Sequence, residues 1–130
     1  MVTPIEIVTA FIAEWGKSNE AMLASYRRYF TAATVWENVG LTVSTGIEEA
    51  LAVLKGFEPA FGVHYIKVDM LHVAVAGNVV LTERLDRMMN KNGIEAWTVR
   101  LMGVFEVENG KIARWREYFD NTAIPQPNAS

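Results

Sequence analysis

The sequence contains no cysteine and only two histidines, His64 and His72. Thiolate catalysis, iron–sulfur clusters and thiolate zinc sites are therefore excluded, and a histidine-based metal site is nearly excluded as well. A chain of 130 residues buries about two-thirds of its unfolded surface, so it needs neither a disulfide nor a structural metal to hold a core. The missing cysteines fit a reducing compartment, and we expect a cytoplasmic protein.

Basic residues and long apolar runs are also scarce. The 12 basic side chains are outnumbered by 15 acidic ones, which gives a formal net charge of −3. Without a basic patch the chain lacks the electrostatic pattern that nucleic-acid binding requires. Glu6 and Glu14 interrupt the apolar N-terminal segment, and no basic region precedes it. We therefore expect no signal peptide, no membrane span and no membrane partner.

Apolar residues are nevertheless abundant, and in the N-terminal half they recur at three- and four-residue spacing. This spacing predicts three helices. The first follows Thr3-Pro4, the second begins at the pair Ser18-Asn19, and the third follows Gly46. These are residue types that cap or open helices. We expect Gly56 and Pro59 to stop the third helix.

From residue 63 onward the apolar period changes to two, which predicts strands joined by short turn pairs into three antiparallel hairpins. The expected strands are Val63–Val75, Val79–Met89, Ile94–Val107 and Lys111–Phe119. A short β-prone run, Thr34–Asn38, lies between the second and third helices, and residues 121–130 are expected to form a tail. The order predicts one α+β domain over residues 1–130, with three helices covering a strongly curved, mostly antiparallel sheet. Such a cone would enclose a deep apolar pocket.

Side chains alternate between the two faces of a strand, so parity assigns each residue to one side. In Lys111–Phe119, the face that carries Trp115 and Phe119 is apolar apart from Glu117. This pattern is expected of a pocket wall with a single acid, although a solvated glutamate near a strand end would look the same. The preceding strand has an apolar face made of Trp97, Val99, Leu101 and Phe105.

Parity is less informative for the strand Val79–Met89, because both of its faces carry charged residues. Arg84 and Asp86 share one face, and the simplest interpretation is an exposed ion pair that contributes little to stability. Trp36 and Asn38 share one side of the short Thr34–Asn38 run. The pattern alone therefore leaves open whether Arg84 and Asp86 point inward.

Several of these segments resemble the limonene-1,2-epoxide hydrolase family. The segments are Thr82-Glu83-Arg84-Leu85-Asp86, Leu101-Met102-Gly103-Val104-Phe105, Gly110-Lys111-Ile112 and Trp115-Arg116-Glu117-Tyr118-Phe119-Asp120, with weaker likeness at Trp36-Glu37-Asn38 and around Gly46. The resemblance covers most of residues 5–120. It implies a curved mixed sheet, a deep apolar pocket and a homodimer, within a cone-shaped superfamily that also holds ketosteroid isomerases, SnoaL-type polyketide cyclases and nuclear transport factor 2.

The resemblance also implies a site that opens epoxides with water in one step, without a cofactor, a metal or a covalent intermediate. The proton donor of the family matches Asp86, the arginine that holds both acids matches Arg84, and the acid that takes a proton from water matches Glu117. Asn38 and Trp36 match the positions that hold the water. Two of these positions depart from the family, because Glu117 replaces an aspartate and Trp36 replaces a tyrosine. The glutamate side chain is longer than that of aspartate and moves the carboxylate. A displacement of about 1 Å can lower the rate on the order of a hundredfold.

The predicted substrate-binding wall is apolar and consists of Met22, Leu54, Val63, Tyr65, Met88, Trp97, Val99, Leu101, Trp115 and Phe119. It suits a terpenoid, aryl, alkyl or steroid epoxide, which would yield a vicinal diol, and not a sugar. Two alternatives stay open: an isomerase, cyclase or lyase with Asp86 or Glu117 as base, and a non-catalytic module that binds apolar ligands. An outward strand face of mixed apolar and charged residues also predicts a homodimer.

Overall fold

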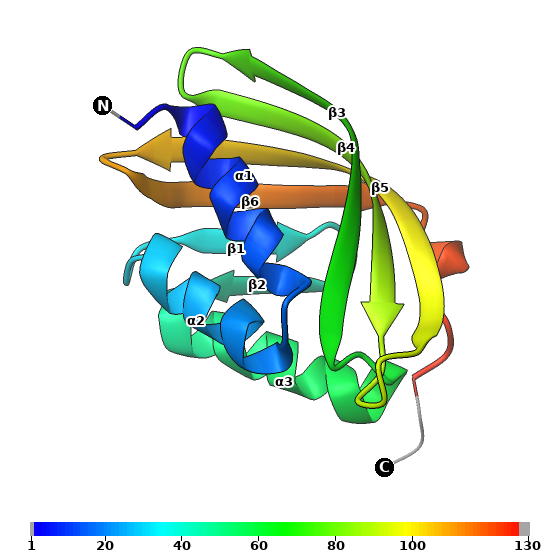
Figure 1. Ribbon diagram of the computed structural model, residues 1–130. Helices are drawn as coiled ribbons and strands as arrows, with labels where there is room; N and C mark the ends of the chain where they lie inside the picture. The colour runs from blue at the N-terminus through cyan, green and yellow to red at the C-terminus, as the bar shows by residue number, and fades with distance from the viewer. Residues whose placement is uncertain (1, 128–130) are drawn as a thin grey trace.

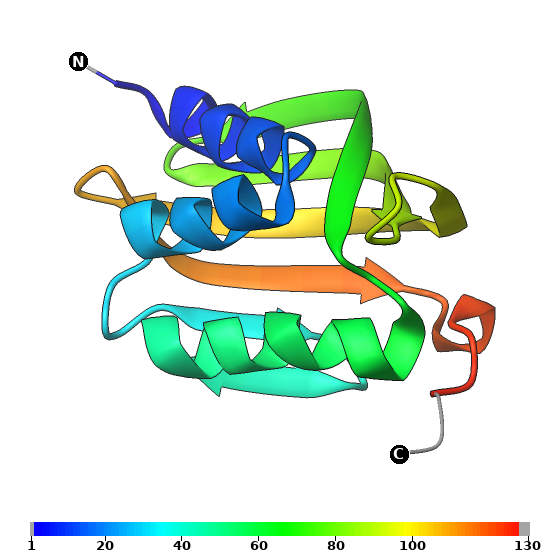
Figure 2. The ribbon, with the colours of Figure 1, turned by 60° about the horizontal axis from the view of Figure 1, so that its bottom comes forward.

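Three helices cover one face of a six-stranded, strongly curved sheet in the computed structural model, which describes residues 2–127 (Figure 1). The helices are α1 (Pro4–Trp15), α2 (Asn19–Tyr29) and α3 (Ile47–Phe61). The strands are β1 (Val35–Asn38), β2 (Thr42–Thr45), β3 (Tyr65–Ala76), β4 (Val79–Met89), β5 (Glu95–Glu108) and β6 (Lys111–Phe119). Figure 2 looks onto the covered face, with the helices in front of the sheet. The α+β fold class predicted from the sequence is therefore confirmed.

The starts of α1 and α2 are set by capping side chains, as predicted. Thr3 accepts a hydrogen bond from the backbone N–H of Glu6, and the Glu6 side chain bonds back to Thr3, which completes a capping box. Ser18 caps α2 by accepting from the backbone N–H of Ala21 at 3.0 Å. These bonds satisfy N–H groups that have no partner inside the helix.

The predicted end of α3 is wrong, because the helix continues past Gly56 and Pro59 to Phe61. Proline in a helix costs about 3 kcal/mol, but two aromatic rings on this turn, Phe57 and Phe61, pack against the core. Complete burial of such a side chain stabilises by roughly 1.5–3 kcal/mol, so the partial burial of these two rings offsets part of the cost of the proline. The helix ends instead at Gly62, which adopts a left-handed conformation with φ +73°.

The sheet order is β2-β1-β6-β5-β4-β3, with the three predicted hairpins β3–β4, β4–β5 and β5–β6. Strand β1 runs parallel to β6, so the sheet is mixed. The short strand β2 was not predicted. The register of β1 against β6 aligns Trp36 with Trp115 and Asn38 with Glu117. Residues about 80 positions apart in the chain thus become neighbours.

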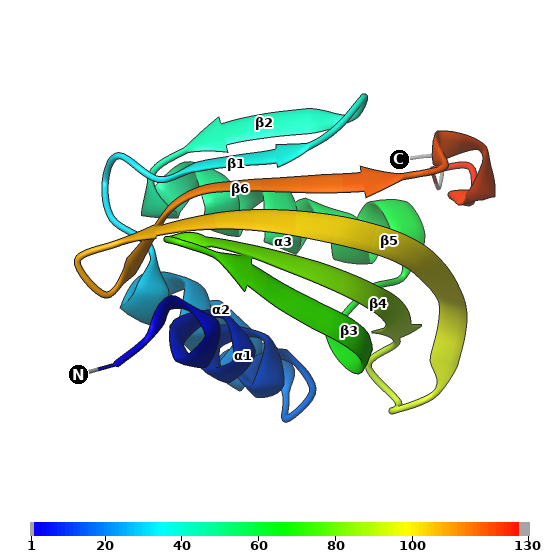
Figure 3. The ribbon, with the colours of Figure 1, turned by 90° about the horizontal axis from the view of Figure 1, so that it is seen from above.

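The pairing of the long strands is irregular in places. The register shifts between Met70 and His72 in β3 and between Glu106 and Val107 in β5, and bulges of this kind increase the local twist and bend a strand. Figure 3 shows β3, β4 and β5 curving around the helices. No helix in residues 2–127 is long and apolar enough to cross a bilayer.

The segment after β6 was expected to form a tail over residues 121–130. A 3₁₀ helix, Asn121–Ala123, begins it, and Asp120 caps that turn by accepting from the N–H of Thr122. The next residue, Ile124, packs against the core. Residues 128–130 lie outside the described part of the chain.

Gly46 at the start of α3 gives a stability prediction. Its backbone has φ +85° and ψ 178°, a region that costs non-glycine residues about 1–3 kcal/mol. A Cβ there would lie 3.0 Å from the carbonyl oxygen of Ala32. Gly46→Ala should lower the free energy of unfolding in urea by about 1–3 kcal/mol. Gly56→Ala is the control, because a Cβ at Gly56 would lie in open space. This substitution should raise the free energy of unfolding by roughly 0.5–1 kcal/mol. Equal effects of the two substitutions would contradict this account.

Candidate active site

A cavity of about 260 Å³ lies between the helices and the concave face of the sheet. Its lining is almost wholly apolar and aromatic, with a few polar side chains from β1, β4 and β6. The predicted wall residues Leu54, Val63, Met88, Trp97, Val99, Leu101, Trp115 and Phe119 all line it. Further residues reach it that the sequence patterns did not single out, among them Trp15, Tyr26, Phe57, Phe61, Ile66 and Ile124.

Two predicted wall residues, Met22 and Tyr65, do not line the cavity. Met22 is buried in the core one helical turn before Tyr26, and the cavity reaches α2 at Tyr26. Tyr65 begins β3 beside Ile66, and only Ile66 faces the cavity. Because successive side chains on a strand point to opposite faces, Tyr65 points away. The placement of Met22 depends on how far α2 reaches along the cavity, which periodicity does not encode.

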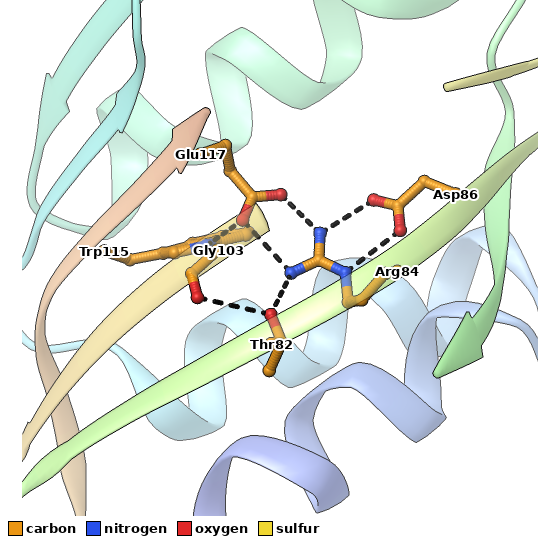
Figure 4. A network of polar contacts seen from close by, with 6 residues as sticks. All are labelled: Thr82, Arg84, Asp86, Gly103, Trp115 and Glu117. Carbon is orange, nitrogen blue, oxygen red and sulfur yellow. Dashed lines mark hydrogen bonds and ion pairs between the residues drawn. The ribbon is translucent and has the colours of Figure 1, made fainter. Parts of the chain in front are cut away.

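The face of β4 that carries Arg84 and Asp86 points inward. The interpretation of these two residues as an exposed ion pair is therefore wrong. Arg84, Asp86 and Glu117 are 0%, 2% and 4% exposed. Asp86 and Glu117 lie in the wall of the cavity, and Arg84 lies between them (Figure 4). The three residues that the family resemblance singled out therefore meet.

All five N–H groups of Arg84 are used. Nε donates to Oδ1 of Asp86 at 3.0 Å and Nη2 to Oδ2 at 2.8 Å. Nη1 donates to Oε1 of Glu117 at 3.1 Å, and Nη2 also contacts Oε2. The remaining N–H of Nη1 goes to Oγ1 of Thr82 at 3.0 Å. Each carboxylate is thus held by two donors, which fixes the geometry of both acids, and the guanidinium has no donor left for a ligand.

Further contacts complete this network. The indole N–H of Trp115 donates to Oε1 of Glu117 at 2.6 Å, and the Thr82 hydroxyl donates to the carbonyl oxygen of Gly103 at 3.4 Å (Figure 4). The guanidinium carbon of Arg84 lies 5.4 Å from the ring of Trp15 and 5.9 Å from that of Phe105, where cation–π attraction favours a positive charge. Thr82 shares the strand face of Arg84 and Asp86, so parity alone could have added it to the candidate site.

Burial and the neighbouring charges shift the ionisation of Arg84 and Glu117. Burial opposes the charge on Arg84, but the carboxylates of Asp86 and Glu117 outweigh it and raise the pKa of Arg84. Burial raises the pKa of Glu117 to about 7, and Arg84 offsets only part of that effect. Burial and the charge of Glu117 also raise the pKa of Tyr26. The site therefore holds a carboxyl group that can exchange a proton near neutral pH.

Asn38 and Trp36 both line the cavity but differ in their bonding. The Asn38 side-chain amide donates to Oγ1 of Thr42 at 3.0 Å. The indole N–H of Trp36 is buried and has no hydrogen-bond partner in residues 2–127. The Trp36 ring instead stacks on Trp115, with centroids 4.9 Å apart and planes 9° from parallel. Trp36 therefore supports the residue that holds Glu117.

Metal ligands are not clustered in the described part of the chain, where no group of three His, Asp or Glu side chains could hold an ion. His64 pairs with Glu58 at 2.9 Å and His72 with Glu83 at 2.8 Å. His72 lies on the exposed outer face of the sheet. Neither histidine lines the cavity.

Helices packed on a curved mixed sheet around an apolar cavity define the cone-shaped fold of the ketosteroid isomerase-like and NTF2-like proteins. A protein with the ketosteroid isomerase-like fold from Catenulispora acidiphila DSM 44928 has a TM-score of 0.72 and 19% identity, covering 94% of this chain and 90% of its own. At that identity the likeness establishes the fold alone.

The sequence matches the family described as limonene-1,2-epoxide hydrolase catalytic domain over residues 2–127, and the chain belongs to this family. The chain is 33% identical to epoxide hydrolase EphG of Mycobacterium tuberculosis (strain ATCC 25618 / H37Rv) over 87 residues, and this matched segment makes up 66% of the chain. The matched segment spans 54% of that relative's length. A solved LEH-like epoxide hydrolase of M. tuberculosis has a TM-score of 0.72 and 28% identity, with 93% of this chain and 85% of that chain covered.

The raised pKa of Glu117 makes stability depend on pH. Between pH 4.5 and about 7 the folded chain keeps a proton that the unfolded chain releases, so stability should fall as pH rises through this window and level off above it. The total change should be on the order of a few kcal/mol. Glu117→Gln should remove this part of the pH dependence in urea unfolding series. If the free energy of unfolding changed equally with pH in the wild type and in Glu117→Gln, the pH dependence would come from another group.

Proposed function

We propose that this protein is a cofactor-independent epoxide hydrolase that adds water in one step to a small apolar epoxide and releases a vicinal diol. The observation that carries the proposal is one arginine, Arg84, holding two buried acids at the wall of an otherwise apolar cavity. Membership of the limonene-1,2-epoxide hydrolase family and the likeness to two proteins named as epoxide hydrolases support it.

In the proposed reaction, the two acids share one proton and use it in a single step. Asp86, in its protonated form, donates to the epoxide oxygen as the C–O bond breaks, because an alkoxide is a poor leaving group at neutral pH. In the form of the pair whose proton lies on Asp86, Glu117 is ionised and takes a proton from the water that attacks the ring carbon. The water oxygen forms the new C–O bond, and the pair ends with its proton on Glu117. Return of that proton to Asp86 resets the site.

Asn38 is the proposed holder of the attacking water. It is aligned with Glu117 across β1 and β6, and its amide nitrogen is engaged with Thr42. Its carbonyl oxygen is then left to accept from the water while Glu117 takes the other proton. Trp36 can only donate and its N–H is buried without a partner in residues 2–127. Its proposed contribution is therefore to support Trp115.

The cavity lining narrows the proposed substrate. The cavity of about 260 Å³ is lined almost wholly by apolar and aromatic side chains. This lining suits terpenoid, aryl, alkyl or steroid epoxides and offers few partners for the hydroxyl groups of a sugar. Apolar walls supply most of the binding through burial.

An isomerase, cyclase or lyase is the second candidate. One observation favours it: Glu117 has a pKa of about 7, which suits a base that removes a proton from carbon next to a carbonyl. Such an enzyme would exchange substrate hydrogen with deuterated solvent and incorporate no solvent oxygen. A non-catalytic binding module would instead bind apolar ligands and leave every epoxide unchanged.

A homodimer is proposed through the outer face of the sheet. Apolar side chains there are exposed, among them Leu81, Met102 and Tyr118 at 36%, 45% and 46%. Charged residues lie between them, including Arg116 and Glu83, and a mixed face of this kind is typical of subunit contacts. The proposal requires a solution mass of twice the 14.6 kDa chain, and a monomeric mass would contradict it.

Removing the proposed proton donor tests the assignment. Asp86→Asn keeps the size of the side chain but has no acidic proton, so diol formation should fall by on the order of a thousandfold. The measurement is mass analysis of products formed from a panel of epoxides in oxygen-18 water. Glu20→Gln, an exposed acid on α2 away from the cavity and from the proposed subunit contact, is the control and should retain wild-type turnover. Wild-type turnover by Asp86→Asn would exclude Asp86 as the donor.

The pH dependence of the rate tests whether the two acids share one proton. The last proton leaves the pair with an apparent pKa of about 7, as Glu117 indicates, and above that pH no acid remains to protonate the epoxide. Log kcat/KM should therefore decline above pH 7 with a limiting slope of about −1 per pH unit. A rate that instead climbs through pH 7 and stays high would mean that Glu117 acts alone as a base.

A further inference from the structure

Glu117 and Arg84 lie on strands that are not neighbours. Strand β5 runs between β6 and β4, so the two backbones are about 9.5 Å apart at the usual strand spacing. The two side chains must therefore meet above β5. The residue of β5 that pairs with both Glu117 of β6 and Thr82 of β4 is Gly103.

The backbone at this position does not require glycine. Gly103 is absent from the glycines with positive φ in residues 2–127, and it lies inside a regular strand. A glycine in a strand interior weakens the strand, since it adds backbone entropy and packs no side chain. A gain elsewhere must offset that cost.

The space above Gly103 is already filled by the polar network. A Cβ at this position would lie 2.6 Å from Nη1 of Arg84 and 2.9 Å from Oγ1 of Thr82, and closer still to Oε1 of Glu117. These are the atoms that join Glu117 to Arg84 and Arg84 to Thr82. Figure 4 shows Gly103 directly beside this junction. Even the smallest side chain at position 103 would separate the two ionic partners.

We propose that Gly103 and Glu117 form a coupled pair, in which the missing side chain at 103 gives the long glutamate arm the room to reach Arg84. Gly103 is thus a positioning residue of the proposed hydrolase site, on whose function this inference rests. An aspartate at 117 would be one methylene shorter and would draw back from Gly103. The cost of a Cβ at 103 should therefore depend on which acid occupies position 117.

The experiment is a double-mutant cycle of Gly103→Ala and Glu117→Asp, with Gly56→Ala as a glycine-to-alanine control away from the site. Gly103→Ala should lower kcat about a hundredfold, the cost of displacing a catalytic group by about 1 Å, with a smaller change in KM. In the Glu117→Asp background the same substitution should change kcat by less than about threefold. Gly56→Ala should leave kcat unchanged.

A second readout does not depend on turnover. The carboxyl carbon of residue 117, followed by NMR through a pH titration, reports its contact with Arg84 directly. In Gly103→Ala the pKa of Glu117 should rise above about 7, because the acid stays buried while its stabilising contacts with Arg84 are lost. In the Glu117→Asp background the titration should not respond to Gly103→Ala.

The outcomes separate the two proposals. A shifted titration in a protein that hydrolyses no epoxide would keep the coupled pair and reject the proposed function. Wild-type kcat and titration in Gly103→Ala, or equal effects of Gly103→Ala in both backgrounds, would overturn the coupling. If Gly103→Ala alone does not fold, the comparison of Glu117→Asp with the double variant decides, since the proposal requires the double variant to fold.

Discussion

The buried charge of Arg84 is the constraint on which the rest of the site depends. A guanidinium that is 0% exposed is tolerated only when its donors are satisfied and its charge is balanced. Five hydrogen bonds satisfy the donors of Arg84, and the carboxylates of Asp86 and Glu117 balance its charge. With both acids ionised the trio would carry one net negative charge inside an apolar wall. One retained proton makes it neutral, which explains why burial keeps a proton on the pair near pH 7.

The topology of the sheet brings this trio together at the wall of the cavity. Arg84 and Asp86 come from β4 and Glu117 from β6, with β5 between them, so the network crosses three strands. Strand β1 adds Asn38 through its parallel pairing with β6. Because these groups sit on sheet strands and not on loops, packing and backbone pairing hold them at fixed distances. A preorganised site of this kind does not need to rearrange as charge develops in a reaction.

Local patterns in the sequence predicted those features that depend on neighbouring residues. The alternation around Trp115 correctly gave the inward face of β6, and capping residues correctly gave the starts of α1 and α2. The inward face of β4 could not be predicted in this way, because Arg84 is buried by a partner 33 positions away in the sequence. Only the resemblance to a family indicated that contact. The prediction that α3 ends at Pro59 was wrong for the same reason. Tertiary packing of Phe57 and Phe61 offsets part of the free-energy cost of a proline in the helix.

The cone fold and its apolar cavity do not by themselves separate a hydrolase from an isomerase. An isomerase moves a proton from one carbon to another with a single base, and a protonated acid that donates to the enolate oxygen can assist it. Epoxide hydrolysis in one step needs a proton given to oxygen while another is taken from water, and so needs two acids in opposite protonation states. Arg84 binds both acids and holds them on one guanidinium. Both reactions can therefore use a second acid, and membership of the limonene-1,2-epoxide hydrolase family is what favours hydrolysis over isomerisation.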